Sequence, residues 1–188
     1  MDILGQFRDL DDPDSFVWLR GFSDMPTRKQ ALEAFYGGPV WKANARVANA
    51  TMVSVDNVLL LRPLSGLRVE ADGRPPPGST AAQPGLLGVT IHRPAEPEVY
   101  ALELEPALGA AGISVLATFA TEHSVNTYPA LPVREDENVF VWMALFADED
   151  DHERHLATLE QSPVWHDLPQ GPAEVLRLTP TPRSMIHG

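Results

Sequence analysis

The stretch FVWLRGF at residues 16–22 returns almost unchanged as FVWMALF at residues 140–146. In both places the tripeptide PVW begins 17 residues after the last Phe, at residues 39–41 and 163–165. A single offset of 124 residues therefore relates the apolar stretch, the spacing and the tripeptide. Because chance rarely repeats all three in the same order, the sequence predicts an internal duplication.

Both copies of the repeated stretch are apolar on two faces. Side chains alternate along a strand, so Phe16 and Trp18 point to one side while Val17 and Leu19 point to the other. An antiparallel strand with one wet face would carry polar residues at alternate positions. We therefore expect an α+β protein of two halves, with antiparallel sheets face to face, helices outside and a barrel-like interior.

The first half is predicted to span residues 1–63. Strands are expected where apolar and β-branched residues cluster, and helices where apolar residues recur every three or four positions. These segments are a strand at 3–8, a strand at 16–22, a helix at 25–36, a helical segment at 39–50 and a strand at 57–63. The first helix should bury Leu32 and its apolar neighbours, with Arg28, Lys29 and Glu33 elsewhere on its surface.

A run rich in Pro, Gly, Ser and Ala at residues 64–85 is predicted to be a linker. The second half, residues 86–180, precedes a loose tail at 181–188. Its order is strand, helix, strand, strand, helix, strand, which is the ferredoxin-like order. The segments are 86–92, 95–111, 113–121, 140–146, 148–161 and 174–180. Within 95–111 the letters EVYALELE also alternate like a strand; a helix is favoured because glycines end it before the next strand.

The first half lacks a counterpart of residues 86–112, which are the opening strand and helix of the second half. Its last strand would then miss a neighbour, and unpaired buried backbone is costly. Three outcomes are open. The natural chain starts further upstream, or a strand from another chain or a second copy of this one fills the gap, or the last strand closes directly on the hairpin.

Composition excludes several classes of partner. The chain of 188 residues has a net charge of −12, which disfavours binding to nucleic acid or to an anionic membrane. It has no cysteine, so disulfides and thiolate chemistry are excluded. The N-terminus has neither a basic start nor a long apolar core, and we expect a cytoplasmic protein.

The runs FVWLRGF, ALEAFYGGPVW and NVLLLRP, together with the Asp-rich turn at 9–15, resemble a NIPSNAP domain. The stretch NTYPALPVREDENVFVWMALF resembles the second copy found in bacterial tandem members. This resemblance implies the dimeric α/β barrel superfamily, which includes cofactor-independent monooxygenases, haem-degrading enzymes and stress-responsive proteins. NIPSNAP proteins share no agreed catalytic motif, so the resemblance transfers no catalytic residue.

The loop at residues 122–138 is long and polar, and such loops often carry function. His123 could shuttle a proton, and Asn126 or Arg134 could hold an oxyanion. The plainer alternative is a hairpin loop in which Arg134 is paired with a nearby acid. The candidates for lining a pocket for a flat apolar ligand are Trp18 and Trp142, which occupy equivalent positions, and Tyr128. Core packing explains the two tryptophans equally well.

Histidines in the second half raise the question of a metal. His152 and His155 are three positions apart, near Asp148, Asp151 and His166, but this acidic segment is more typical of a solvated helix start. We expect no metal and no cofactor, and no GxGxxG, GxSxG or HExxH motif occurs. The leading expectation is a protein that binds a small apolar molecule in or beside the barrel. The alternatives are a monooxygenase-like enzyme and a non-enzymatic interaction protein.

Overall fold

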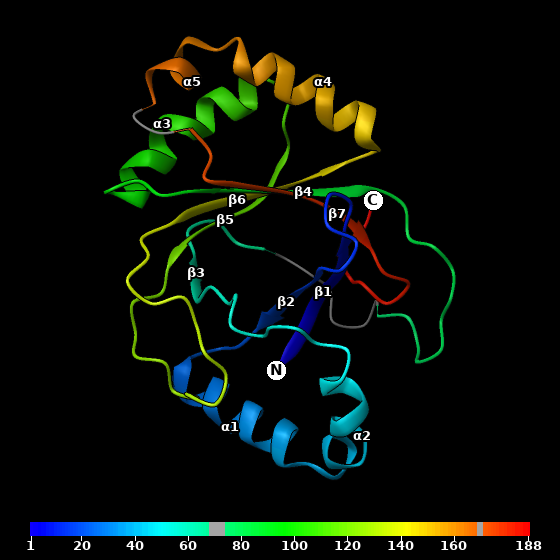
Figure 1. Ribbon diagram of the computed structural model, residues 1–188. Coiled ribbons are helices and arrows are strands. Elements are labelled where there is room, and N and C mark those ends of the chain that lie inside the picture. The colour runs from blue at the N-terminus through cyan, green and yellow to red at the C-terminus, as the bar shows by residue number, and fades with distance from the viewer. Residues whose placement is uncertain (68–73, 169–170) are drawn as a thin grey trace.

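The computed structural model describes residues 1–67, 74–168 and 171–188, and its centre is one seven-stranded antiparallel sheet (Figure 1). The strand order across the sheet is β2-β1-β7-β4-β6-β5-β3. The strands are β1 Asp2–Asp9, β2 Phe16–Gly21, β3 Leu61–Pro63, β4 Leu86–His92, β5 Val115–Thr121, β6 Phe140–Phe146 and β7 Glu174–Pro180. The helices are α1 Met25–Gly37, α2 Pro39–Asn49, α3 Pro97–Ala110, α4 Glu149–Glu160 and α5 Pro163–Asp167.

The sheet takes strands from both predicted halves. β1 pairs with β7, placing Phe7 opposite Pro180, and β3 pairs with β5, placing Leu61 opposite Thr121. The sheet therefore curls, so that β1, β2 and β3 lie below β4 to β7 in Figure 1, with α3, α4 and α5 above and α1 and α2 at the opposite end. Where two separate facing sheets were expected, the backbone pairing forms one continuous sheet, because β1 and β3 satisfy the outer edges of β7 and β5.

Residues 86–180 follow the predicted succession of elements. The elements occur in the order β4, α3, β5, β6, α4 with α5, and β7. The four strands lie side by side as β7-β4-β6-β5. All seven residues of β4 are buried, as expected for a strand covered on both faces. The ambiguous segment is a helix, α3, which contains Pro106 and whose buried stripe includes Tyr100 and Leu104.

Residues 1–63 agree less closely with the predicted boundaries. β3 has only three residues, whereas a strand over 57–63 was expected. Its earlier part bonds to loop backbone instead: the carbonyls of Val58 and Leu60 accept from Arg134 N and Glu122 N at 2.8 Å each. The predicted linker at 64–85 lies partly outside the described residues.

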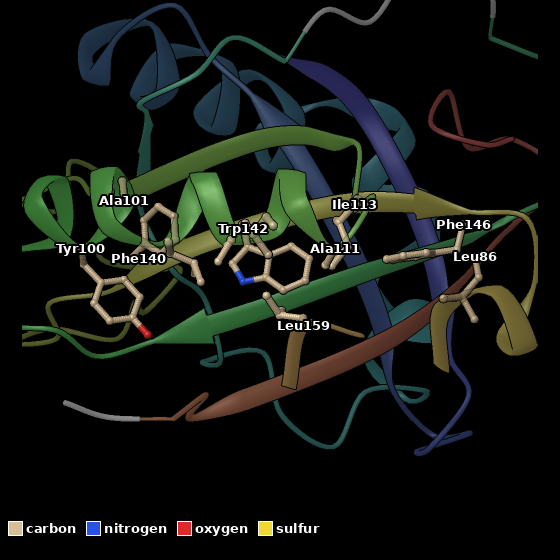
Figure 2. Packing of buried hydrophobic residues seen from close by; sticks show 13 residues of the cluster. Leu86, Tyr100, Ala101, Ala111, Ile113, Phe140, Trp142, Phe146 and Leu159 are labelled. Carbon is tan, nitrogen blue, oxygen red and sulfur yellow. The ribbon is translucent and has the colours of Figure 1, made fainter. Parts of the chain in front are cut away.

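Two apolar clusters cover the two faces of the sheet. The helix-side cluster packs α3 against Phe140, Trp142 and their neighbours on the outer face (Figure 2). The inner cluster fills the inside of the curl, with Val141 and Met143 from β6 and Phe7 from β1. Successive residues of β6 alternate between the clusters, which explains why this copy of the repeated stretch is apolar on both faces.

No helix in the described ranges is long and apolar enough to cross a membrane.

Residues 1–63 and residues 86–180 both contribute side chains to the inner cluster, so we expect the two segments to unfold together. Phe7 is buried in β1 against strands of residues 86–180, so Phe7→Ala should lower the free energy of unfolding by about 3–5 kcal/mol. The measurement is urea denaturation followed by far-UV and near-UV circular dichroism. Val53→Ala, at a fully exposed position, is the control and should change stability little. Two separate transitions, of which only one moves in Phe7→Ala, would contradict the shared core.

Candidate functional site

The 122–138 loop folds against helix α1 instead of projecting into solvent. Thr127 Oγ1 donates a hydrogen bond to the Met25 carbonyl oxygen at 3.1 Å. The ring of Tyr128 stacks on Tyr36, with centroids 5.8 Å apart and an interplanar angle of 12°. Two segments about 100 residues apart in sequence therefore form one surface.

Asn126 holds this loop in its conformation. Its Nδ2 donates to the Leu131 carbonyl at 3.0 Å, and its Oδ1 accepts from Tyr128 N at 3.0 Å. The same Oδ1 accepts a hydrogen bond from Arg28 Nη1 at 3.0 Å. The sequence makes Asn126 a candidate for holding an oxyanion; in the structure its amide bonds to the loop backbone and to Arg28.

Arg28 is a buried cation in α1, with 3% of its surface exposed. Its Nη1 donates to Asn126 Oδ1 and, at 3.4 Å, to Thr127 Oγ1, both of which are neutral acceptors. Burial lowers the pKa of Arg28 below its usual range, and the positive charge of Arg20 lowers it further. The sequence reading placed Arg28 away from the buried stripe, whereas it lies one turn before the buried Leu32 and is itself buried.

Arg20 is the second cation of this region and comes from β2. Its guanidinium carbon lies 5.4 Å from the centre of the Trp18 ring. Its Nη1 is buried and has no hydrogen-bond acceptor. We define Arg20, Arg28, Asn126 and Thr127 as the arginine site; in the described ranges, neither arginine has a carboxylate within ion-pair distance.

Arg134 has a different environment, in which acids neutralise it. It donates to Glu137 from Nε at 2.8 Å and from Nη2 at 2.7 Å, and to Glu174 from Nη2 at 2.7 Å. Arg93 contacts the same two glutamates. Hydrogen bonds from Arg134 lower the pKa of both carboxyl groups. Arg134 therefore joins the loop to β7, which agrees with the alternative of a hairpin loop in which Arg134 is paired with a nearby acid.

The other sequence candidates lie apart from one another. His123 is exposed on the loop, and Trp142 is 1% exposed within the helix-side cluster (Figure 2). Trp18 lies on the outer face of β2, 41% exposed, with its ring edge-to-face to that of Phe16 at 5.7 Å. Neither tryptophan belongs to the inner cluster, so neither lines the inside of the curl.

A buried polar cluster at the end of β4 escaped the sequence reading. His92 is fully buried; its Nδ1 lies 2.7 Å from Tyr100 Oη, and Trp142 Nε1 donates to its Nε2 at 3.3 Å. An indole N–H can only donate, so Nε2 accepts and Nδ1 carries the proton. Burial lowers the pKa of His92 to about 4 and raises the pKa of Tyr100 to about 12. The neutral histidine fixes the position of Trp142.

The two histidines of α4 have different neighbours. His152 is buried beside Phe146, and His155 Nδ1 lies 2.7 Å from the Asp151 carbonyl. Over the described ranges, no three His, Asp or Glu side chains gather as metal ligands.

Two open hollows of about 390 and 400 Å³ lie around Gly85, at the surface rather than inside the curl.

No family model, curated protein or solved structure matches this chain.

The pKa of His92 predicts a pH dependence of stability. Between pH 6.5 and about 4 the unfolded chain binds a proton at this residue that the native state does not. Stability is therefore full above pH 6.5 and is lost as the pH falls, by at most about 3 kcal/mol. Urea denaturation from pH 7.5 to 4.5 should show a smaller loss in His92→Gln than in the wild type.

His123→Gln is the matched control for this experiment, because it removes an exposed histidine and leaves the buried cluster intact. Its pH profile should follow that of the wild type. Parallel profiles for the wild type and His92→Gln would show that His92 is not the group responsible.

Proposed function

We propose that the chain is a NIPSNAP-type member of the dimeric α/β barrel class, built by duplication of a ferredoxin-like unit. The structural positions of the sequence repeats support this proposal. FVW begins β2 and β6, and PVW begins α2 and α5, each shortly after the longer helices α1 and α4. The strand order β7-β4-β6-β5, with its two connecting helices, agrees with the order expected of a ferredoxin-like unit and supports this proposal.

The absence of a counterpart of β4 from residues 1–63 also fits this proposal. In residues 86–180 the opening strand β4 lies between β7 and β6. The duplication makes β3 the counterpart of β7, and β2 the counterpart of β6. A missing counterpart of β4 would then lie between β3 and β2, which are the two outer edges of the observed sheet. A strand in that place, supplied by a second copy of this chain, would complete the curl.

For the activity, we propose that the protein binds a small, mostly apolar molecule beside the sheet. The observation that carries this is the aromatic pair on the outer face of β2, where Phe16 and Trp18 are 46% and 41% exposed. The inner cluster already fills the inside of the curl with side chains. Two neighbouring aromatic rings offer a flat apolar ligand an edge and a face on which to stack.

A second candidate, a protein-interaction function, is favoured by helix α2. Val40 and Val47 are two turns apart on one side of this helix and are 75% and 61% exposed. No residue of α2 is buried. Exposed apolar side chains that share one helix face are typical of a surface that contacts another protein.

The uncharged dye Nile red tests the small-molecule proposal. Its fluorescence should rise saturably with the wild-type protein, and Trp18→Ala should weaken binding about tenfold, the value of one aromatic stacking contact. Val47→Ser is the matched control on α2 and should leave binding unchanged. No saturable binding, or equal binding by wild type and Trp18→Ala, would refute the site. Loss of binding only in Val47→Ser would favour the interaction function.

A further inference from the structure

The arginine site contrasts with the ion-paired arginines of this chain. The protein has 26 acidic and 14 basic residues, so carboxylates are abundant. In the described ranges, the arginines that form an ion pair with a glutamate or aspartate are Arg62, Arg93, Arg134, Arg154 and Arg177. In the described ranges Arg20 and Arg28 lack such a partner, as do Arg8, Arg46, Arg74 and Arg183, but of these only Arg28 is almost fully buried.

Holding two uncompensated cations together costs free energy. A buried charge is tolerated when it is paired, and removing its partner destabilises a protein strongly. Arginine cannot relieve this cost by releasing its proton at any ordinary pH. The positive charge of Arg20 adds to the effect of burial in lowering the pKa of Arg28. The folded chain therefore maintains a local excess of positive charge.

The hydrogen bonds of the site leave donors for a ligand. Both side-chain bonds of Arg28 come from Nη1, so its Nε and Nη2 have no acceptor in the described structure. Arg20 has the buried Nη1, which likewise has none. A guanidinium fork of this kind matches the two oxygens of a carboxylate or a phosphate.

The site is also held in place before any ligand arrives. Asn126 and Thr127 fix Arg28, and Asn126 is itself fixed by Tyr128 N and the Leu131 carbonyl. The ring of Trp18 supports the guanidinium of Arg20, and because Arg20 is only partly buried, the pair can be reached from its side. Such pre-organisation reduces the entropy lost on binding.

We propose that Arg20 and Arg28 bind the oxyanion group, carboxylate or phosphate, of a small molecule. The ligand's oxygens accept from Nε and Nη2 of Arg28, and Arg20 supplies a second positive charge. This goes beyond the proposed function, because the anion site exists whether or not an apolar molecule binds at Trp18.

Isothermal titration calorimetry with sodium phosphate and, separately, sodium acetate tests the proposal, with sodium chloride keeping the ionic strength constant. Saturable heat is expected for at least one of the two anions, and the comparison identifies the preferred group. Arg20→Met and Arg28→Met should each weaken that binding about tenfold or more, the value of a charge-assisted hydrogen bond. Arg46→Met removes an exposed cation of α2 and should bind like the wild type.

Asn126→Asp provides a test that does not remove either arginine. The new carboxylate would sit at hydrogen-bond distance from Arg28 and occupy the site with an internal anion. Anion binding should fall while circular dichroism shows a folded chain, which separates loss of the site from loss of the fold. The proposal is overturned if neither anion binds the wild type. It is equally overturned if Arg20→Met and Asn126→Asp, both folded, bind like Arg46→Met.

Discussion

Backbone pairing at the two outer edges of β7-β4-β6-β5 is the constraint on which the rest of the structure depends. These four strands leave β7 and β5 with unpaired N–H and C=O groups, and such groups are costly when buried. β1 satisfies one edge and β3 the other. Because both come from residues 1–63, the same pairing curls the sheet, creates the inner cluster and places α1 beside the 122–138 loop.

The two copies of FVW show how one sequence pattern acquires two roles. In β6 the tryptophan is covered by α3 and donates its indole N–H to His92. In β2 the equivalent Trp18 remains 41% exposed and supports Arg20. In both places the stretch forms a strand with one face on the inner cluster, while the outer face is core in β6 and an exposed surface in β2.

Much of the fold could be predicted from local patterns. Runs such as LLGVTIH and FVWMALF specify buried strands by composition alone, and Asp24 and Asp148 mark helix starts by capping chemistry. The joining of the strands into one sheet was not predictable, since pairing between β1 and β7 depends on residues about 170 positions apart.

The arginine site was hidden for a related reason. Arg28 lies one helical turn before Leu32, so its position on the buried stripe was available from spacing, but its charge argued for the surface. The neutral partners that permit its burial are 98 and 99 residues away, on a loop with no regular pattern. For Asn126, composition indicated a polar residue in a functional loop, but only the fold shows that its amide faces Arg28.

The pairing of β1 with β7 has a consequence for the order of events on the ribosome. β1 can pair with β2 soon after both are synthesised, but its second neighbour, β7, follows only about 170 residues later. Until then β1 and β2 form an isolated hairpin, which is marginally stable in water. The α3-covered strands β4, β5 and β6 can associate earlier, because the contacts among them are closer in sequence. The β1–β2 hairpin thus lacks its β7 neighbour while the residues between them are synthesised, and its apolar strands are exposed to chaperones during that time.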